Sequence, residues 1–378
     1  MRSRGILLIF ILYLGGSLSA QDFHFSQFQH SPLNVNPALT GIYEFGYWGN
    51  DLRMIGNYRD QWRSIPSAYV STPTPFKTNS FSADMKLRNV RYLKKDFIGV
   101  GAVFYSDKAG DLDFKTQQVN FSLSYSKLLN YHGDKYLTAG FTGGYSKRSI
   151  DYTNAVFDNQ WTGTQFDPSR ASGESFPGMR YTYPDLSAGM AFSFIPVDKI
   201  NFTSGFAIMH LNKPRQNFLS SNSGNPQSYR VVLYPTMVFH TNARIPLRNK
   251  RFLLPNILYL KQGPAREFNC TSYFQVRPED KDRLNYQFGL GYRIVGNYQH
   301  TPASDALIAA VKFLYNNLSM TFSYDANTSS LKRSTKSIGG FEISIICYER
   351  FFNPKRYKDM KARPECPRYD DFKDFPVW

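Results

Sequence analysis

The sequence predicts an all-β protein, a membrane-spanning antiparallel β-barrel of about fourteen strands. Segments in which apolar and polar residues alternate recur along the chain. In TQQVNFSLSYSKLL at 116–129, for example, Val119 and Phe121 alternate with Asn120 and Ser122. Aromatic residues are abundant, with 32 Phe and 26 Tyr among 378 residues, yet the mean hydropathy is that of a soluble protein. A barrel explains both properties, because only alternate residues of its strands face lipid.

The first twenty residues predict a secretory signal peptide. Arg2 and Arg4 precede an apolar run from Ile6 to Leu14, and small residues follow as far as Ala20. This run is shorter than the roughly 20 residues that a membrane-spanning helix needs, and no later apolar stretch is longer. A mature chain that crosses a membrane is therefore expected to do so with strands.

The chain is strongly basic, with a formal net charge of +16 that falls to +14 when Arg2 and Arg4 leave with the signal. Inside a cell such a balance favours nucleic acid as the partner, but an export signal argues against it. For an exported protein, anionic lipid headgroups or acidic partner surfaces are the expected contacts. Outer-membrane lipid is thus a predicted partner, and nucleic acid is not.

Fourteen segments show the alternation expected of strands, an even number as single-chain bacterial barrels require. They lie near 52–62, 79–87, 97–105, 116–129, 136–148, 184–195, 199–210, 229–241, 252–260, 267–277, 284–294, 304–315, 317–326 and 337–347. Two kinds of connection alternate between consecutive strands. One kind is mostly short, such as 196–198, and the other includes the longest connections, such as 149–183. In outer-membrane barrels the short turns are periplasmic, so both termini are expected in the periplasm. A soluble β-sandwich or propeller is the alternative, but the chain shows no repeat of propeller length.

Two segments lie outside these strands. Residues 21–50 are rich in turn-forming Pro, Asn and Gly, and are expected to form a periplasmic N-terminal segment or a plug over the periplasmic mouth. Residues 348–378 contain four prolines and are expected to form a periplasmic tail. The predicted order is signal peptide 1–20, segment or plug 21–50, barrel 51–347 and tail 348–378.

Polar residues on the inward strand face are the best candidates for a site within the barrel. Arg59 and Asp60 are neighbours, so only one of them can point inward on a regular strand, and the other marks the rim or a bulge. One interpretation is a buried salt-bridge network that braces a plug, and the other is a passage or ligand site for an exported protein. The lumen-facing candidates are Arg59, Asp60, Lys86, Arg293, Asp325 and Glu342.

Trp161 and Phe166 lie in the longest connection and are the candidate contacts for a secreted client, with a position resting on the barrel rim as the alternative. DKAGDLDF at 107–114 lacks the spacing of an EF-hand, and the sequence contains neither HExxH nor GxSxG. A phospholipase-like enzyme would need a Ser/His pair, for which His210 is the strand-borne candidate, and we expect that histidine to be structural. No metal, cofactor or enzyme activity is therefore predicted.

Eight motifs follow one another between about residues 23 and 346. They are HFSQFQHSPLNVNPALTG, NYRDQWRSIPSAY, DKAGD, FDNQWTG, FAIMHLNKPRQNF, LPNILYLKQGPAREF, SDALI and SYDANTSSLKRSTKSIGGFEISI. Each is weak alone, but the ordered set resembles the PorP/SprF family of type IX secretion membrane proteins. The resemblance implies an outer-membrane barrel that helps proteins with C-terminal sorting domains reach or stay on the cell surface, as part of the secretion and gliding machinery. It also implies periplasmic partners, including type IX ring components and a peptidoglycan-binding protein.

The predicted function is thus that of a non-catalytic outer-membrane component of type IX secretion, with a general diffusion porin for small solutes as the alternative. A lumen filled by loops and a tightly ordered segment 21–50 would favour the first. An open lumen lined by one sign of charge would favour the second.

Overall fold

The structure is a computed structural model that describes most of the chain. The residues it describes are 25–43, 50–63, 76–88, 96–110, 112–130, 133–153, 155, 157–167, 169–174, 179–196, 199–216, 232–276, 284–296, 302–330, 332 and 337–350. Within these residues, no helix combines the length and the apolar character needed to cross a membrane.

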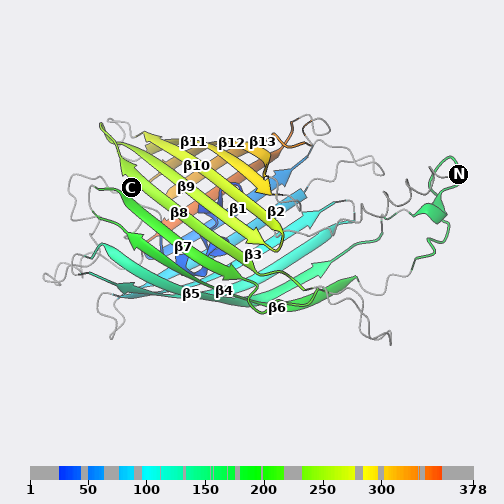
Figure 1. Cartoon of the computed structure of the whole chain (residues 1–378), viewed down its shortest axis with the longest axis horizontal. Helices are drawn as coiled ribbons and strands as arrows, with labels where there is room; N and C mark the ends of the chain where they lie inside the picture. The colour runs from blue at the N-terminus through cyan, green and yellow to red at the C-terminus, as the bar shows by residue number, and fades with distance from the viewer. Residues whose placement is uncertain are drawn as a thin grey trace, which may run out of the picture.

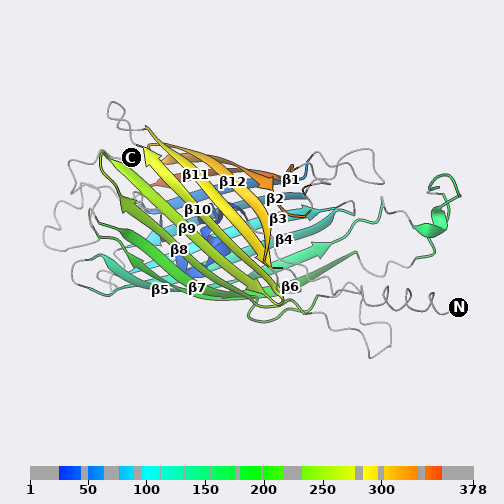
Figure 2. The ribbon, with the colours of Figure 1, turned by 45° about the horizontal axis from the view of Figure 1, so that its top comes forward.

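Fourteen strands form one closed antiparallel barrel, as the alternation predicted (Figures 1 and 2). They are β1 (Leu52–Gln61), β2 (Phe76–Leu87), β3 (Phe97–Ala109), β4 (Phe114–Leu128), β5 (Lys135–Ser149), β6 (Arg180–Phe194), β7 (Asn201–Met209), β8 (Thr236–Pro246), β9 (Arg251–Gln262), β10 (Ala265–Val276), β11 (Leu284–Gly296), β12 (Pro302–Tyr315), β13 (Leu318–Asn327) and β14 (Gly340–Glu349). Each strand pairs with its neighbours in sequence, and β1 pairs with β14 to close the ring. Closure leaves no strand edge without a partner, which the interior of a bilayer requires.

The eighth strand begins later than predicted, at Thr236 instead of near residue 229. Pro235 directly precedes it, and a proline has no backbone N–H to donate to a neighbouring strand. Upstream of this proline, Val232 forms only an isolated bridge with Arg215.

The two ends of the barrel differ in the length of their connections. One end, here called the turn end, carries the links 88–96, 129–134, 195–200, 247–250, 277–283 and 316–317. The opposite, loop end carries 62–75, 110–113, 150–179, 210–235, 263–264, 297–301 and 328–339. The start of β1 pairs with the end of β14, Leu52 opposite Glu349, so the barrel begins and ends at the turn end. The longest connections thus share one end, as predicted.

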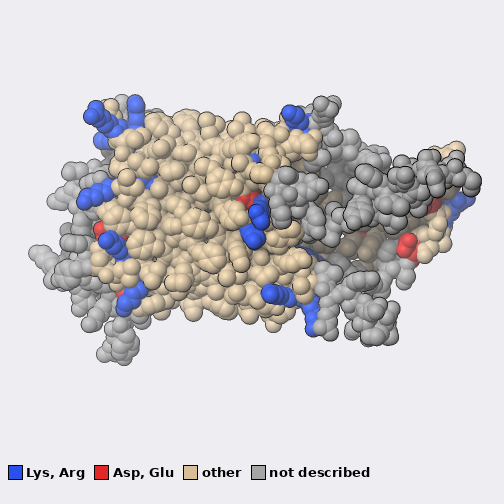
Figure 3. All heavy atoms as spheres, viewed as in Figure 1, with Lys and Arg blue, Asp and Glu red and all other residues tan. Residues whose placement is uncertain are grey.

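The outer face of the barrel is apolar around its middle. Figure 3 shows a broad band without Lys, Arg, Asp or Glu, between two zones where basic residues gather. On β4, Phe121 is 67% exposed and Leu123 is 56% exposed, whereas Ser122 and Ser124 are buried. The apolar face of this strand therefore belongs to the outer band, and its serines point into the barrel.

The interior is occupied by residues 25–43, here called the inner segment, drawn in blue inside the barrel in Figures 1 and 2. It contains three short helices, η1 (Phe28–His30), α2 (Pro32–Val35) and η2 (Pro37–Leu39). The last of these contacts β4, β5, β6 and β7. Small apolar clusters form where the segment meets the wall, and one of them joins Ala38 and Leu39 to Phe97 and Tyr136. The segment and the wall therefore share one core.

Candidate functional site

The local sequence of the inner segment explains its tight turns. Pro32 and Pro37 stand at the first positions of α2 and η2, where a missing N–H costs nothing and a fixed φ favours the helix. Between them, the Asn36 side chain accepts a hydrogen bond of 2.8 Å from the backbone N–H of Ala38 and so caps η2. Gly41 adopts a φ of 74°, which favours glycine. The segment thus folds back on itself within a few residues.

Four buried charges surround the beginning of the inner segment. Arg59 pairs with Glu342, and its second terminal nitrogen lies 3.2 Å from Asp325. Arg293 lies 3.0 Å from the same Asp325 oxygen and 2.6 Å from Asp305. The side chains of Arg59, Arg293, Asp325 and Glu342 are at most 5% exposed. We call these four residues the charge cluster.

The charge cluster holds the backbone and the hydroxyl of Ser26. The Ser26 N–H donates to one Glu342 oxygen at 2.7 Å, and the Gln27 N–H donates to the other at 3.0 Å. The Ser26 hydroxyl donates to Asp325 and accepts from Arg59 at 2.8 Å and from Arg293 at 2.5 Å. Because each charge contacts both a partner charge and the inner segment, removing one member would leave the others incompletely paired.

A second buried ion pair holds the other end of the segment. Arg53 and Asp84 form two parallel contacts of 2.9 Å, a geometry in which both carboxylate oxygens are engaged. Arg53 also donates to the carbonyls of Ile42, at 2.9 Å, and Leu39, at 3.2 Å. Asp84 in turn accepts the Gly41 N–H at 2.7 Å. The segment is thus fixed by buried charges near both of its ends.

The middle of the segment lies against glycines of the wall. Gly99, Gly140 and Gly189 point inward from β3, β5 and β6, and a Cβ at any of them would overlap the inner segment. At Gly140 the overlap is with the backbone of Pro37 and Ala38. Glycine is therefore required at these positions by the close approach of two backbones.

Asn36 ties this middle part to three strands. Its amide nitrogen lies 3.0 Å from His240 Nε2 and donates to the carbonyls of Met190, at 3.1 Å, and Phe206, at 3.3 Å. His240 is 1% exposed. A buried side chain with this many partners defines the position of the segment along the barrel axis.

His30 connects the segment to β12. Its Nε2 lies 3.1 Å from Lys312 Nζ, and its Nδ1 lies 2.8 Å from Gln27 Oε1. These partners are compatible with a neutral ring that donates from Nδ1 and accepts at Nε2. Burial, and secondarily the charge of Lys312, lowers the pKa of His30 well below its usual 6.5.

Acidification is therefore expected to loosen the inner segment. The pKa of His30 is lower when the inner segment is in place than when it is released, so the released segment binds more protons below pH 6.5. The stabilisation by neutral His30 is therefore lost as the pH falls below that value. Hydrogen-exchange protection of residues 25–43, corrected for the intrinsic effect of pH, should decrease in this range. The variant His30→Asn should lose most of the dependence. If the pH dependence of protection persists in this variant, another group causes it and the prediction is wrong.

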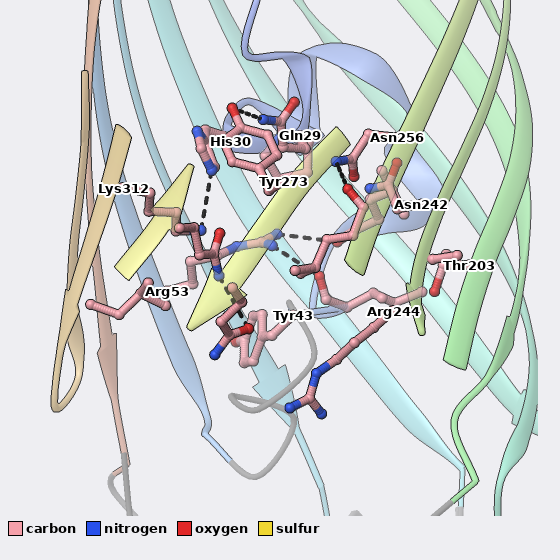
Figure 4. A pocket seen from close by; sticks show the side chains of 18 of the residues that line it. Gln29, His30, Tyr43, Arg53, Thr203, Asn242, Arg244, Asn256, Tyr273 and Lys312 are labelled. Atoms are coloured by element: carbon pink, nitrogen blue, oxygen red, sulfur yellow. Dashed lines mark hydrogen bonds between the residues drawn. The ribbon is translucent and has the colours of Figure 1, made fainter. Parts of the chain in front are cut away.

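The inner segment separates two cavities. The turn-end cavity is lined by His30, Arg53, Arg244, Tyr273 and Lys312 among others, and Figure 4 shows how these side chains surround it. The loop-end cavity is more apolar. Its lining includes Phe25, Phe28, Val35, Met209, Leu258 and Leu260. A solute that entered from either end would therefore meet the segment.

The structure brings four of the six lumen candidates together, namely the members of the charge cluster. Lys86 is buried elsewhere, with its Nζ 4.8 Å from the ring centre of Tyr43 and 4.7 Å from that of Phe97. Asp60 lies on the opposite face of β1 from Arg59. It accepts a hydrogen bond of 3.0 Å from the Tyr58 hydroxyl, and Arg63 lies 3.8 Å away.

Sequence reasoning missed four residues that hold the segment. Arg53 is six residues before Arg59 and therefore shares its inward face, and Asp84 belongs to the polar face of a predicted strand, so alternation could have identified both. Ser26 and Asn36 gave no such signal, because they act from a segment without regular periodicity.

The candidate client residues lie in a small hairpin of the 150–179 connection. Trp161 and Phe166 form an isolated β-bridge with ring centres 4.9 Å apart, and the Thr162 N–H donates to the Gln165 carbonyl at 2.9 Å. Trp161 is 46% exposed. The preceding helix η3 (Asp158–Gln160) lies beyond the strand ends in Figures 1 and 2.

Two weaker sequence features also have defined surroundings. Asp107 accepts a hydrogen bond of 2.6 Å from the Thr78 hydroxyl and Asp113 lies 2.6 Å from Lys108, while Asp111 is outside the described residues. His210 Nδ1 lies 2.8 Å from an oxygen of Asp185.

Several solved structures have a similar fold. A FadL homologue from Pseudomonas aeruginosa is 13% identical, with a TM-score of 0.46 over 89% of this chain and 96% of its own. The CymD monoaromatic hydrocarbon channel is 11% identical, with a TM-score of 0.44 over 84% and 98%. The toluene transporter TbuX of Ralstonia pickettii is 9% identical, with a TM-score of 0.45 over 84% and 92%. The similarity is one of fold.

No curated protein matches the sequence. A protein family, in contrast, matches most of it: residues 17–347 fit the description "Type IX secretion system membrane protein PorP/SprF". This range contains every strand except the last two residues of β14, together with the inner segment and the charge cluster. The chain, whose fourteen strands close into a barrel, is therefore an outer-membrane β-barrel that belongs to the PorP/SprF family of type IX secretion system membrane proteins.

Proposed function

We propose that the protein is a non-catalytic scaffold of the type IX secretion and gliding machinery, not a general diffusion porin. The observation that carries this proposal is the inner segment, which buried charges hold inside the lumen near both of its ends. A diffusion porin needs a water-filled path lined to suit its solutes, whereas a docking barrel needs a rigid body. The described lumen also carries both signs of charge, paired with each other, which supports a bracing role.

We propose further that the turn end faces the periplasm, so that the inner segment, which runs from the charge cluster near the loop end to Arg53 and Asp84 near the turn end, leads into β1 on the periplasmic side, and the tail that follows β14 leaves on the same side. The support is the rule that short turns of outer-membrane barrels are periplasmic. In this orientation the turn end would dock the ring components and the peptidoglycan-binding protein. The loop end would receive or retain a client with a C-terminal sorting domain.

The hairpin with Trp161 and Phe166 is the proposed client contact. An exposed aromatic residue held by a bridge and a turn loses little conformational entropy on binding, which suits it as an anchor. Its position beyond the strand ends would let a secreted protein reach it without entering the lumen.

Purification from outer membranes in mild detergent, with mass spectrometry of what accompanies the protein, tests the proposal. We expect periplasmic ring or peptidoglycan-binding proteins, or a large surface protein, to copurify. In a planar bilayer the purified barrel should show little steady conductance. A barrel that purifies alone and conducts ions would contradict the scaffold and favour the porin.

A further inference from the structure

Five basic side chains lie next to one another on the outer face of β2–β6 at the loop end. Strand pairing places Lys77 opposite Lys108, and Lys108 opposite Lys115. On the next two strands Lys115 pairs with Ser149, and Ser149 pairs with Arg180. Lys147 projects from the same strand as Ser149, two residues nearer the middle of the barrel. We call Lys77, Lys108, Lys115 and Arg180, together with Lys147 from the adjacent row, the cationic row.

The charge of this row is only partly balanced. Lys108 forms an ion pair of 2.6 Å with Asp113. Asp60 is opposite Lys77 in the strand register, but its side chain is 3% exposed and contacts Tyr58 and Arg63. In the part of the chain that the structure describes, the other four cations have no ion pair within 4.0 Å. Like charges directly opposite on neighbouring strands destabilise a sheet, so a bound anion would stabilise this arrangement.

Two further rows lie between the cationic row and the middle of the barrel. The first is polar and uncharged apart from Lys147, with Asn79, Ser106, Gln117 and Thr182 on the neighbouring strands. The second is the edge of the apolar band. Its members are Phe81, Phe104, Val119, Tyr145 and Pro184, of which Phe81 is 56% and Tyr145 67% exposed. Since two residues of a strand span about 6.6 to 6.8 Å, each row lies that far from the next along the strand.

We propose that this face binds a phosphorylated glycolipid of the lipopolysaccharide type. Its acyl chains would lie on the apolar row, its sugar hydroxyl and amide groups on the polar row, and its phosphates on the cationic row. Neighbouring strands are about 4.7 to 4.9 Å apart, so the row from β2 to β6 extends over roughly 19 Å. That width suits a headgroup with more than one phosphate better than a single phospholipid phosphate.

The row on β2–β6 does not continue as a ring around the barrel, although Lys261 on β9 and Arg266 on β10 form a second basic pair at the loop end. On β12, β13 and β14 the described outward strand positions nearest the loop end are Pro302, Ser304, Ala326 and Phe341, none of them basic. The glycolipid assignment uses the orientation proposed above, which places the loop end in the outer leaflet. Binding itself can be measured in either orientation.

Native mass spectrometry of the full-length barrel, titrated with diphosphoryl lipid A in detergent, tests the site. The variant Lys77→Gln/Lys115→Gln/Lys147→Gln removes three cations of the row that form no ion pair with the described residues. The control Lys199→Gln/Arg248→Gln/Lys250→Gln removes three exposed basic residues at the turn end. We expect the first variant to bind lipid A on the order of 100-fold more weakly, from roughly fivefold for each cation near an anionic headgroup, and the control to bind like the wild type.

Three results would overturn the proposal. They are unchanged binding by the first variant, an equal loss in the control, and equally tight binding of phosphatidylglycerol by the wild type. A heat-dependent shift on SDS gels verifies that every variant is a folded barrel. Copurification of periplasmic partners is measured separately, so failure of the lipid site and failure of the scaffold can be told apart.

Discussion

Replacing Arg59 with methionine is expected to release the inner segment from the charge cluster while the barrel stays closed. The change leaves Glu342 without its cationic partner and Asp325 with one of two, in a site where these side chains are 2% exposed. Removing one partner of a buried ion pair costs about 3–5 kcal/mol, because the remaining charge stays desolvated. The strand ladder does not depend on these side chains.

Hydrogen exchange read segment by segment measures this effect. Amides of residues 25–43 should exchange roughly 100- to 4,000-fold faster in Arg59→Met, since each 1.4 kcal/mol corresponds to about a factor of ten, while amides of the strands keep their protection. Arg63→Met is the matched control. The Arg63 side chain is 80% exposed and its pair with Asp60 is 3.8 Å long, so its loss should change stability by less than about 1 kcal/mol.

A double variant separates the charge from the packing. Arg59→Met/Glu342→Met removes both partners, and a buried pair replaced by apolar side chains of similar size is often tolerated. Because the N–H groups of Ser26 and Gln27 also lose their acceptor, we expect only part of the protection to return. Equal exchange in Arg59→Met and Arg63→Met would show that the cluster does not hold the segment.

The barrel could be predicted from the sequence because the period-two pattern determines which residues share a face. Glu342 and Asp325 were placed on the inward face in this way, as alternation against Phe341 and Tyr324 requires. The same pattern does not determine how far along the barrel axis each residue lies. That Arg59, Arg293 and Asp325 meet at one level depends on the register of all the strands between them.

The inner segment could not be predicted in the same way. Its turn-forming residues indicated irregular structure, but its place in the lumen depends on contacts with residues far away in sequence, such as Ser26 with Arg293 and Asn36 with His240. A glycine within a strand, such as Gly99 on β3, can mark the close approach of another part of the chain. The sequence does not say that it is the backbone at Thr40.

Replacing Gly140 with valine is expected to displace the middle of the inner segment. A Cβ at this position would overlap the backbone of Pro37 and Ala38, which cannot move aside as a flexible side chain can. Overpacking a well-filled core costs about 1–3 kcal/mol, and a clash with backbone belongs at the upper end. Valine itself favours strands, so the barrel should still form.

Gly56→Val on β1 is the matched control, because a Cβ at Gly56 meets no atom within 4 Å. Both variants replace a strand glycine with valine. They differ in whether the inner segment lies against that glycine. Faster exchange of residues 25–43 and new conductance steps in a planar bilayer should therefore appear in Gly140→Val alone. A Gly140→Val barrel that remains as protected and as closed as the control would mean that the wall tolerates the added side chain. The segment would then owe its position to the ion pairs near its two ends, and not to the close approach of its backbone to the strands.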